Sequence, residues 1–312
     1  MKRMLKRIFI IPNALFAILL LAQLLPNKPY RIEDRPLYTV VLAAAVEAVL
    51  LIVSLAVKKD RPRRVISDVI GCVFAFLIFW VLATIKFDLP GNAKQAVFPP
   101  PGAVFEKFAV DFAPMLINVR DSIFLILDGY LIGVVTAIPL GLFFGWNLRI
   151  GDAAGYLTKF FSSISPLVYI PYAIVLLPTF RAASVFVIFM ATFWPTLAST
   201  MSGVLNVEKR IIDSAKTLCV GRFTMLFQII LPAALPQIFI GLYQGLSVSF
   251  ILLVSAEMIG ARSGLGYYVN NYANFGNYTS ALAGVITIGV VVAFITFLFN
   301  LLQRFLLRWK QQ

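Results

Sequence analysis

The residues that could do chemistry in this chain are few. Histidine is absent, which excludes histidine-based acid–base catalysis and every histidine-containing metal site. The sequence has no Gly-x4-Gly-Lys-Ser/Thr phosphate loop, no Gly-x-Ser-x-Gly nucleophile turn and no Cys/His cluster. Its two cysteines, Cys72 and Cys219, form no redox motif. We therefore predict no catalytic residue, no metal and no cofactor.

The most informative spacing lies in a polar segment, residues 206–232, between two apolar runs. Over about 208–219, Ile211, Ala215 and Leu218 share one helical face, which predicts a short amphipathic helix. Gly221 then permits a turn. A second apolar stripe follows, and proline turns the chain at its end: Phe223, Leu226, Phe227, Ile230, Leu231 and Pro232. We expect two short helices at an angle to each other on the membrane surface.

The composition indicates an integral membrane protein. Hydrophobic residues make up 60% of the 312-residue chain and charged residues only 13%, whereas soluble domains are about 25% charged. Most of the basic residues behind the net charge of +13 sit between apolar runs, so the charge reflects membrane topology and no nucleic acid is expected. About eight apolar segments are long enough to span a bilayer: 8–25, 37–57, 65–87, 122–146, 155–178, 183–205, 234–256 and 281–303.

The basic residues also predict the orientation. With the N-terminus inside, 18 of the 27 Lys and Arg fall on the cytoplasmic side, so both termini are expected in the cytoplasm. No Ala-x-Ala-like cleavage site follows the basic start, which favours a retained anchor helix over a signal peptide. The basic segment Lys58–Arg64 is a topology anchor or, alternatively, a binding site for anionic membrane lipid.

Polar and helix-breaking residues inside the apolar segments are candidates for a translocation path. A carboxylate in hydrocarbon costs about 2.5–3.5 kcal/mol on insertion scales. Glu257 therefore lines a path or gate, or is a helix-end carboxylate bonded to nearby backbone. Asp128 is a weaker candidate, with a packing hydrogen bond to Ser122 or Tyr130 as its alternative. A break in the helix that we expect to line the pore is predicted at Ser165, Pro166 and Pro171. A stripe of small residues that allows helices to pack closely is predicted at Gly133, Gly141 and Gly145.

The polar segment resembles the cytosolic loop of permease subunits of binding-protein-dependent ABC importers, which carries Glu-Ala-Ala-x3-Gly-x9-Ile-x-Leu-Pro. Asp213, Ser214 and Ala215 fall on Glu-Ala-Ala, and Cys219 falls on the glycine. Ile229, Leu231 and Pro232 fall on the remaining positions without a gap. Cysteine in place of glycine adds a side chain at the helix turn, and Gly221 is expected to restore flexibility there.

The resemblance extends over about residues 64–310 and is similar to the nitrate, sulfonate, taurine and bicarbonate branch. Segments that match that branch are Ser165–Pro171, Pro232–Pro236, Ala256–Met258 and Gly264–Tyr267. It implies an all-α integral membrane protein with the type I importer permease fold. The family core has six helices, so residues 1–60 are expected to form an extra N-terminal transmembrane hairpin.

The resemblance implies the transmembrane subunit of an ATP-driven importer for a small anion or organic solute, in a bacterial inner membrane. Its implied partners are two ATPase subunits, a second permease copy and an extracytoplasmic solute-binding protein, which docks on residues 88–120 and 257–280. The ATPase-coupling residues would be those of the motif together with Gly221. Two alternatives remain: a secondary transporter driven by an ion gradient, and an assembly or sensor subunit without transport.

Overall fold

The computed structural model describes residues 2–24, 34–56, 60–86 and 97–308, and within these ranges the chain is helical and has no β-strand. Five helical stretches are long and apolar enough to cross a membrane, and a sixth is bent by 67° at a break. Because hydrocarbon offers the backbone no hydrogen-bonding partner, helices are the expected solution for such a sequence. The predicted all-α membrane fold is confirmed, but the predicted number of eight spans is not.

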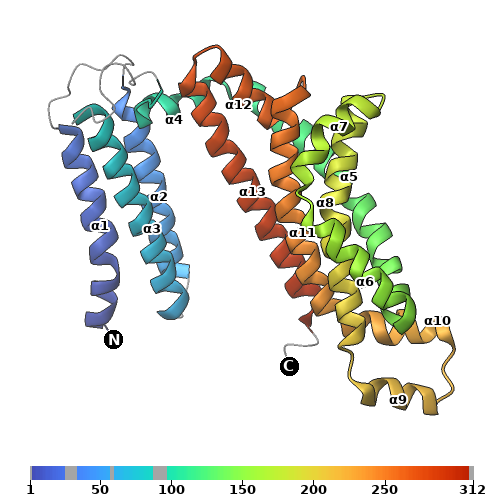
Figure 1. The fold of residues 1–312 in the computed structure, drawn as a ribbon. Helices are drawn as coiled ribbons and strands as arrows, with labels where there is room; N and C mark the ends of the chain where they lie inside the picture. The colour runs from blue at the N-terminus through green and yellow to red at the C-terminus, as the bar shows by residue number, and fades with distance from the viewer. Residues whose placement is uncertain (1, 25–33, 57–59, 87–96, 309–312) are drawn as a thin grey trace. The chain divides into compact units, whose positions relative to one another are not determined.

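The chain divides into two compact units, which are described separately. Unit 1 comprises Met1–Pro114 and Val269–Ile286, and unit 2 comprises Met115–Tyr268 and Thr287–Gln312. The helices in Figure 1 run in chain order as α1 (Lys2–Leu24), α2 (Pro36–Ala56), α3 (Asp60–Val81), α4 (Pro101–Val110), α5 (Phe112–Trp146), α6 (Leu148–Ser163), α7 (Tyr169–Leu176), α8 (Phe180–Leu205), α9 (Lys209–Thr217), α10 (Arg222–Thr224), α11 (Leu231–Gly260), α12 (Leu265–Asn274) and α13 (Tyr278–Leu306).

In unit 1, α1 packs chiefly against α3, and the rings of Phe16 and Phe74 lie 5.7 Å apart. The apolar parts of α1 and α2 span only Pro12–Gln23 and Pro36–Val49. The boundary of the predicted hairpin at residue 60 therefore stays a prediction, and the side chains of Lys58–Arg64 lie outside the described residues.

The proline run of unit 1 leads directly into a helix. Pro100 is extended, whereas Pro101 and Gly102 already form the buried first turn of α4. Proline suits that position because its missing N–H would have no partner in a first turn. The Trp80 indole N–H donates to the Pro99 carbonyl at 3.1 Å and so fixes the entry into α4.

In unit 2, α8 lies between α5 and α11, and glycines allow the close approach. A Cβ built on Gly133, Gly141 or Gly145 of α5 would come within 2.6–2.8 Å of the Cβ of Thr192, Thr200 or Val204 of α8. On the opposite side, a Cβ on Gly241 of α11 would meet Ser199. The predicted packing role of the glycine stripe is confirmed.

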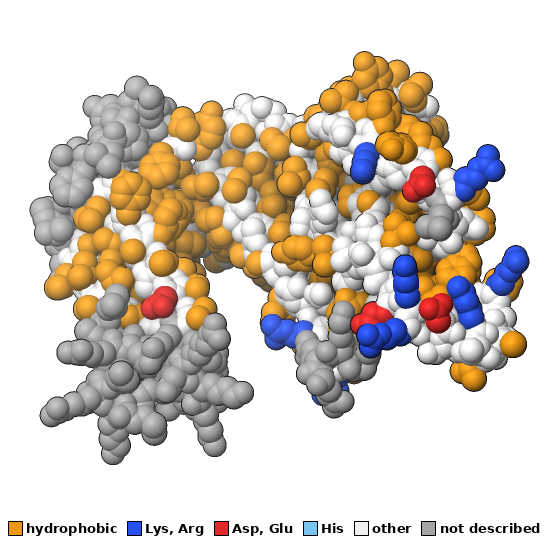
Figure 2. Space-filling view, turned by 60° about the horizontal axis from the view of Figure 1, so that its bottom comes forward, with side chains coloured by type: hydrophobic (Ala, Val, Ile, Leu, Met, Phe, Trp, Pro, Cys, Tyr) orange, Lys and Arg blue, Asp and Glu red, His pale blue; other side chains and the backbone are white. Residues whose placement is uncertain are grey.

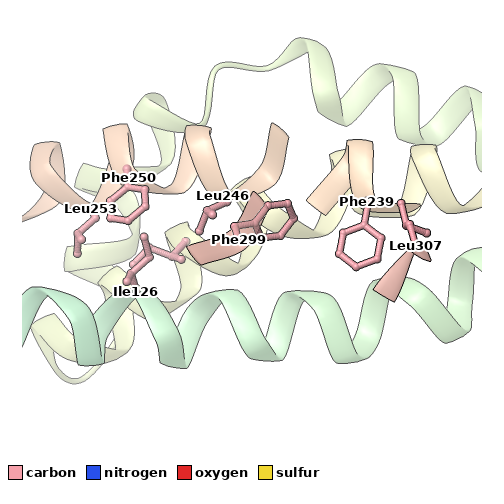
Figure 3. Packing of buried hydrophobic residues seen from close by; sticks show 8 residues of the cluster. Ile126, Phe239, Leu246, Phe250, Leu253, Phe299 and Leu307 are labelled. Atoms are coloured by element: carbon pink, nitrogen blue, oxygen red, sulfur yellow. The ribbon is translucent and has the colours of Figure 1, made fainter. Parts of the chain in front are cut away.

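Polar groups between these helices are paired. The Thr192 hydroxyl donates to the Ile188 carbonyl at 3.0 Å and lies 2.8 Å from the Ser249 hydroxyl of α11. An apolar cluster joins α5, α11 and α13. Figure 3 shows Ile126 of α5 facing Phe250 and Leu253 of α11, and Phe299 of α13 farther along the bundle, between Leu246 and Phe239. The result is a bundle whose helices connect the two ends of unit 2.

Gly141→Ala should destabilise the protein by about 1–3 kcal/mol, because the new methyl group would overlap the Thr200 side chain. Gly289→Ala on α13 is the matched control. A Cβ there meets nothing within 4 Å, so helix propensity alone should stabilise it by about 0.5–1 kcal/mol. Thermal unfolding of the two purified variants in detergent measures both effects. Equal shifts in the melting temperature would contradict the close contact.

Candidate functional site

The polar segment is anchored to the bundle through Ala215. This alanine of α9 is 4% exposed and belongs to an apolar cluster with Leu142 of α5, Val204 of α8 and Ile230 just before α11. Motion of α9 would therefore act on the ends of three long helices. A bulky side chain would not fit at this position, which explains the small residue in the motif.

The predicted inner face of α9 is partly wrong. Ile212, not Ile211, packs with Ala215 in the cluster, whereas Ile211 is 41% and Leu218 78% exposed. Leu218 lies beyond the last helical turn, where the backbone has already left the helical path. Asp213, Ser214 and Lys216 are exposed, as a docking surface requires.

Cys219 ends α9 in a left-handed conformation, with φ of +49°, and it is the one non-glycine residue with positive φ in the described ranges. The Cys219 N–H donates to the Lys216 carbonyl at 3.0 Å, and the Val220 N–H donates to the Ala215 carbonyl at 3.3 Å. These two bonds form a Schellman cap, whose left-handed residue is usually glycine. The glycine of the family motif therefore has a conformational role that cysteine fills here.

Gly221 does not make the turn that the sequence suggested. Its φ is −62° and it precedes α10 in an extended conformation, so the left-handed turn lies two residues earlier. From Arg222 to Gly260 the chain is helical throughout, with a π-helical stretch at Met225–Ile230. In Figure 1 the segment labelled α10 crosses the end of unit 2, and α11 rises from it.

The second apolar stripe also differs from the prediction. Met225 and Ile230 are buried, and Ile229 and Leu231 pack beside them. Phe223 and Phe227 are 80% and 48% exposed, and their rings stack at 6.3 Å. Most of the charged side chains visible in Figure 2 gather toward the lower part of unit 2.

At the other end of α11, Glu257 holds the following loop. The residue is 1% exposed. Its Oε1 accepts from the Ser122 hydroxyl at 2.7 Å, and its Oε2 accepts from the Gly266 N–H at 2.7 Å. The Ser122 oxygen accepts in turn from the Leu265 N–H at 2.8 Å. Of the two roles left open by the sequence, this geometry favours a helix-end carboxylate bonded to nearby backbone.

The same network extends to Asn118, whose Oδ1 accepts from the Gly264 N–H at 2.8 Å. Gly264 has φ of +111°, and any Cβ there would overlap the Glu257 carboxylate. Sequence reasoning missed Asn118 and missed Ser122 as the partner of Glu257. Their spacing of four residues on one helix face was the available signal.

Asp128 forms an ion pair that the sequence did not predict. Its Oδ2 accepts from Arg181 Nη2 of α8 at 2.6 Å, with side-chain exposures of 41% and 70%. The proposed partners Ser122 and Tyr130 are wrong, because residues six and two positions away do not share its helix face. The Tyr130 hydroxyl donates instead to the Leu242 carbonyl at 3.0 Å.

The predicted break is present between α6 and α7. Ser165 is exposed and extended, and Pro166 starts a 3-10 turn that leads into α7. Pro171 lies in α7 and is also exposed. Ile170 and Ala173 of α7 pack against Val187 of α8 and Ala256 of α11. The break is confirmed, while a pore-lining role for Ser165, Pro166 and Pro171 stays a prediction.

Cys219→Gly should stabilise the protein by about 1 kcal/mol, because glycine adopts the left-handed conformation without the cost that a Cβ adds. Cys219→Val should destabilise it, since a β-branched side chain is the least tolerated there. Gly221→Ala is the control and should change stability by less than about 0.5 kcal/mol, given its negative φ and open surroundings. Thermal unfolding and amide exchange at Val220 measure these effects. A larger loss from Gly221→Ala than from Cys219→Val would mean that the turn is misplaced.

Glu257→Ala should destabilise the loop at 261–266 by about 1–3 kcal/mol, because the Gly266 N–H and the Ser122 hydroxyl lose their buried acceptor. Adding Ser122→Ala to Glu257→Ala should cost less than the sum of the single changes, because the two residues share one network. Ser255→Ala is the control, since its hydroxyl bonds only to its own helix, at the Ile251 carbonyl. Protease cleavage of the loop and thermal unfolding are the measurements. Strict additivity would contradict the network.

Comparison with known proteins agrees with this architecture. The sequence of residues 129–312, more than half of the chain, matches the family described as binding-protein-dependent transport system inner membrane component. A probable ABC transporter permease protein of Brucella abortus is 33% identical over 187 residues, which cover 60% of this chain and 75% of the relative.

Relatives with named substrates are similar over comparable lengths. The taurine transport system permease protein TauC of Escherichia coli is 28% identical over 254 residues, covering 79% of this chain and 90% of TauC. The nitrate import permease protein NrtB of Leptolyngbya laminosa is 28% identical over 163 residues, covering 52% and 58%. These names agree with the predicted branch.

A solved structure shares the fold. The inward-facing MetNI methionine ABC transporter aligns with a TM-score of 0.54 at 17% identity, over 62% of this chain and 97% of the matched chain. Permeases of this family are not themselves catalytic; they work with a separate ATPase and a binding protein. This chain therefore belongs to the family of binding-protein-dependent transport system inner membrane components, as the multi-pass permease subunit of an ABC importer.

Proposed function

We propose that residues 206–232 are the coupling segment on which the separate ATPase docks, and that the chain forms the translocation path for a small anion. The docking proposal rests on one observation: one side of this segment is buried against the bundle, and another side exposes large apolar side chains. Ala215 is buried in the bundle, while Leu218, Phe223 and Phe227 are exposed large apolar side chains on a polar loop. Apolar side chains exposed in this way mark interaction sites.

The geometry supports transmission of force as well as docking. The Schellman cap at Cys219 fixes the end of α9, and the apolar cluster around Ala215 ties α9 to α5, α8 and the start of α11. An ATPase that binds α9 differently in its open and closed states would bias the arrangement of these helices. Cys219 replaces the glycine of the motif in this segment. The other motif residues proposed to belong to it are Asp213, Ser214, Ile229, Leu231 and Pro232.

The substrate proposal is a small anion such as taurine, nitrate, another sulfonate or bicarbonate. Its support is the similarity to permeases named for taurine and nitrate transport. We further propose a homodimer with two ATPase subunits, both termini in the cytoplasm, and contact with anionic lipid near Lys58–Arg64. The binding protein docks on the opposite surface, at 257–280 and at 88–120, of which 88–96 lie outside the described residues.

Uptake into proteoliposomes tests this function. The purified chain, its ATPase and its binding protein are reconstituted, and the uptake of labelled taurine or nitrate is followed with and without ATP. Uptake that depends on ATP, on the ATPase and on the binding protein is expected. Uptake that continues without any ATPase would establish the secondary transporter instead. A complex that forms but transports neither anion would favour the sensor or assembly alternative.

Phe223→Asp should weaken ATPase binding at least tenfold, because it places a charge on the exposed apolar surface of the coupling segment. The fold should be unaffected, since the side chain is 80% exposed. Phe275→Asp is the matched control, because Phe275 is 81% exposed in unit 1, outside the coupling segment. Co-purification of the ATPase with each variant is the measurement. Equal retention of the ATPase by both variants would contradict docking on this surface.

A further inference from the structure

Unit 2 contains a cavity of about 410 Å³ beside the loop that Glu257 holds. Its walls come from α5, from the start of α8 and from the end of α11 with the residues that follow it, and the charged ones are Arg120, Asp121, Arg181, Glu257 and Arg262. This volume is within the range of about 300–1,000 Å³ that is typical of small-molecule sites. The hydrogen-bond network around Glu257 does not include the arginines that line this cavity, so the network gives them no role.

The exposed charged groups around this cavity are mainly guanidinium groups. The side chains of Arg120 and Arg181 are 64% and 70% exposed, and Arg262 is exposed as well. The carboxylates are less accessible: Asp121 is 28% exposed, and Glu257 is 1% exposed with both oxygens engaged. Formal charges of the surrounding residues nearly cancel, but the accessible surface is cationic.

The three arginines differ in how many donors remain. Arg181 uses one nitrogen for Asp128, and Arg120 uses Nε and Nη2 for a single oxygen of Asp121. Arg262 has no carboxylate within ion-pair distance among the residues that the structure describes. Because a guanidinium carries five N–H donors, each side chain retains donors for a ligand, and Arg262 retains the most.

The remaining walls favour a compact anion. Phe124, Leu125 and Phe180 supply apolar surface, which lowers the local dielectric and strengthens the attraction between guanidinium and anion. Ser263 adds a hydroxyl donor. Planar or tetrahedral oxyanions accept paired N–H bonds from arginine, which a neutral solute of the same size does not.

We propose that this cavity is a binding site for a small oxyanion, a nitrate, carboxylate or sulfonate group, with Arg262 as its principal ligand and Arg181 and Arg120 as secondary ones. The proposal rests on the proposed function, because it assigns residues to the recognition of the transported anion. It goes further in placing recognition within the permease, separate from the binding protein.

The position of the cavity suits the entry of substrate. Arg181 lies at the start of α8, and the coupling segment follows the end of α8 at Leu205. A helix of 26 residues rises about 39 Å, which exceeds the hydrocarbon thickness of about 30 Å. The cavity and the coupling segment therefore lie on opposite membrane surfaces, and the cavity is on the side where a binding protein would deliver its ligand.

The first experiment measures binding without nucleotide. Calorimetry on the purified permease–ATPase complex, with the probes sodium nitrate, taurine and sodium bicarbonate, should detect binding of at least one of them. Arg262→Gln should weaken that binding at least tenfold, and Arg262→Lys should weaken it less because the charge remains but the paired donors are lost. Arg149→Gln, an exposed arginine on α6 outside the cavity, should leave binding unchanged.

The second experiment separates this proposal from the proposed function. In proteoliposomes with ATP and the binding protein, Arg262→Gln should raise the anion concentration for half-maximal uptake, whereas ATPase co-purification stays at the wild-type level. No binding of the three probes to the complex, or unchanged binding and uptake in both Arg262→Gln and the double variant with Arg181→Gln, would overturn the cavity proposal while leaving ATP-driven import intact. Failure of wild-type uptake alongside anion binding that depends on Arg262 would overturn the proposed function instead.

Discussion

The structure of unit 2 depends on the close approach of α8 to α5 and α11. Glycines of α5 and α11 face α8 side chains at distances that leave no room for a Cβ, so the backbones pack directly against each other. In a bilayer this matters more than in water, because lipid is as apolar as the side chains and association relies on packing and hydrogen bonds. The bonded pair Thr192 and Ser249 shows both contributions at one level of the bundle.

The tightly packed helix α8 also connects the two ends of unit 2. Its first residues contribute Arg181 to an ion pair and to the cavity, and its last residues contribute Val204 to the cluster that anchors the coupling segment. Packed cores rearrange between discrete states more readily than they deform continuously. The proposed contact of the ATPase with α9 would therefore act on the cavity through a rearrangement of whole helices.

Much of the fold was predictable from local signals. The composition predicted a membrane protein, and the glycine spacing predicted the packing face of α5. Ser165 and Pro166 predicted the break between α6 and α7. The helical periodicity placed Ala215 on the apolar face of α9, and this residue is buried. These successes share a cause, because each depends on a preference that acts within a few residues of the chain.

The errors arose where tertiary contacts decide. Ile212 replaces Ile211 on the inner face of α9, and Phe223 points outward, because the position of the bundle beneath the segment is not encoded in its periodicity. The side chains that bond to Glu257 and Asp128, Ser122 and Arg181, lie more than 50 residues away from them in sequence. Pairings at that separation carry no local pattern, so their discovery required the structure.

The left-handed residue at the end of α9 has a practical consequence. Cys219 carries an exposed thiol on the segment assigned to the ATPase, and Cys72 on α3 is the other cysteine of the chain. Replacing Cys72 with serine would leave a single native labelling position, Cys219, at the proposed ATPase interface. A fluorophore or spin label at Cys219 could then report ATPase association in real time, with no cysteine introduced by design.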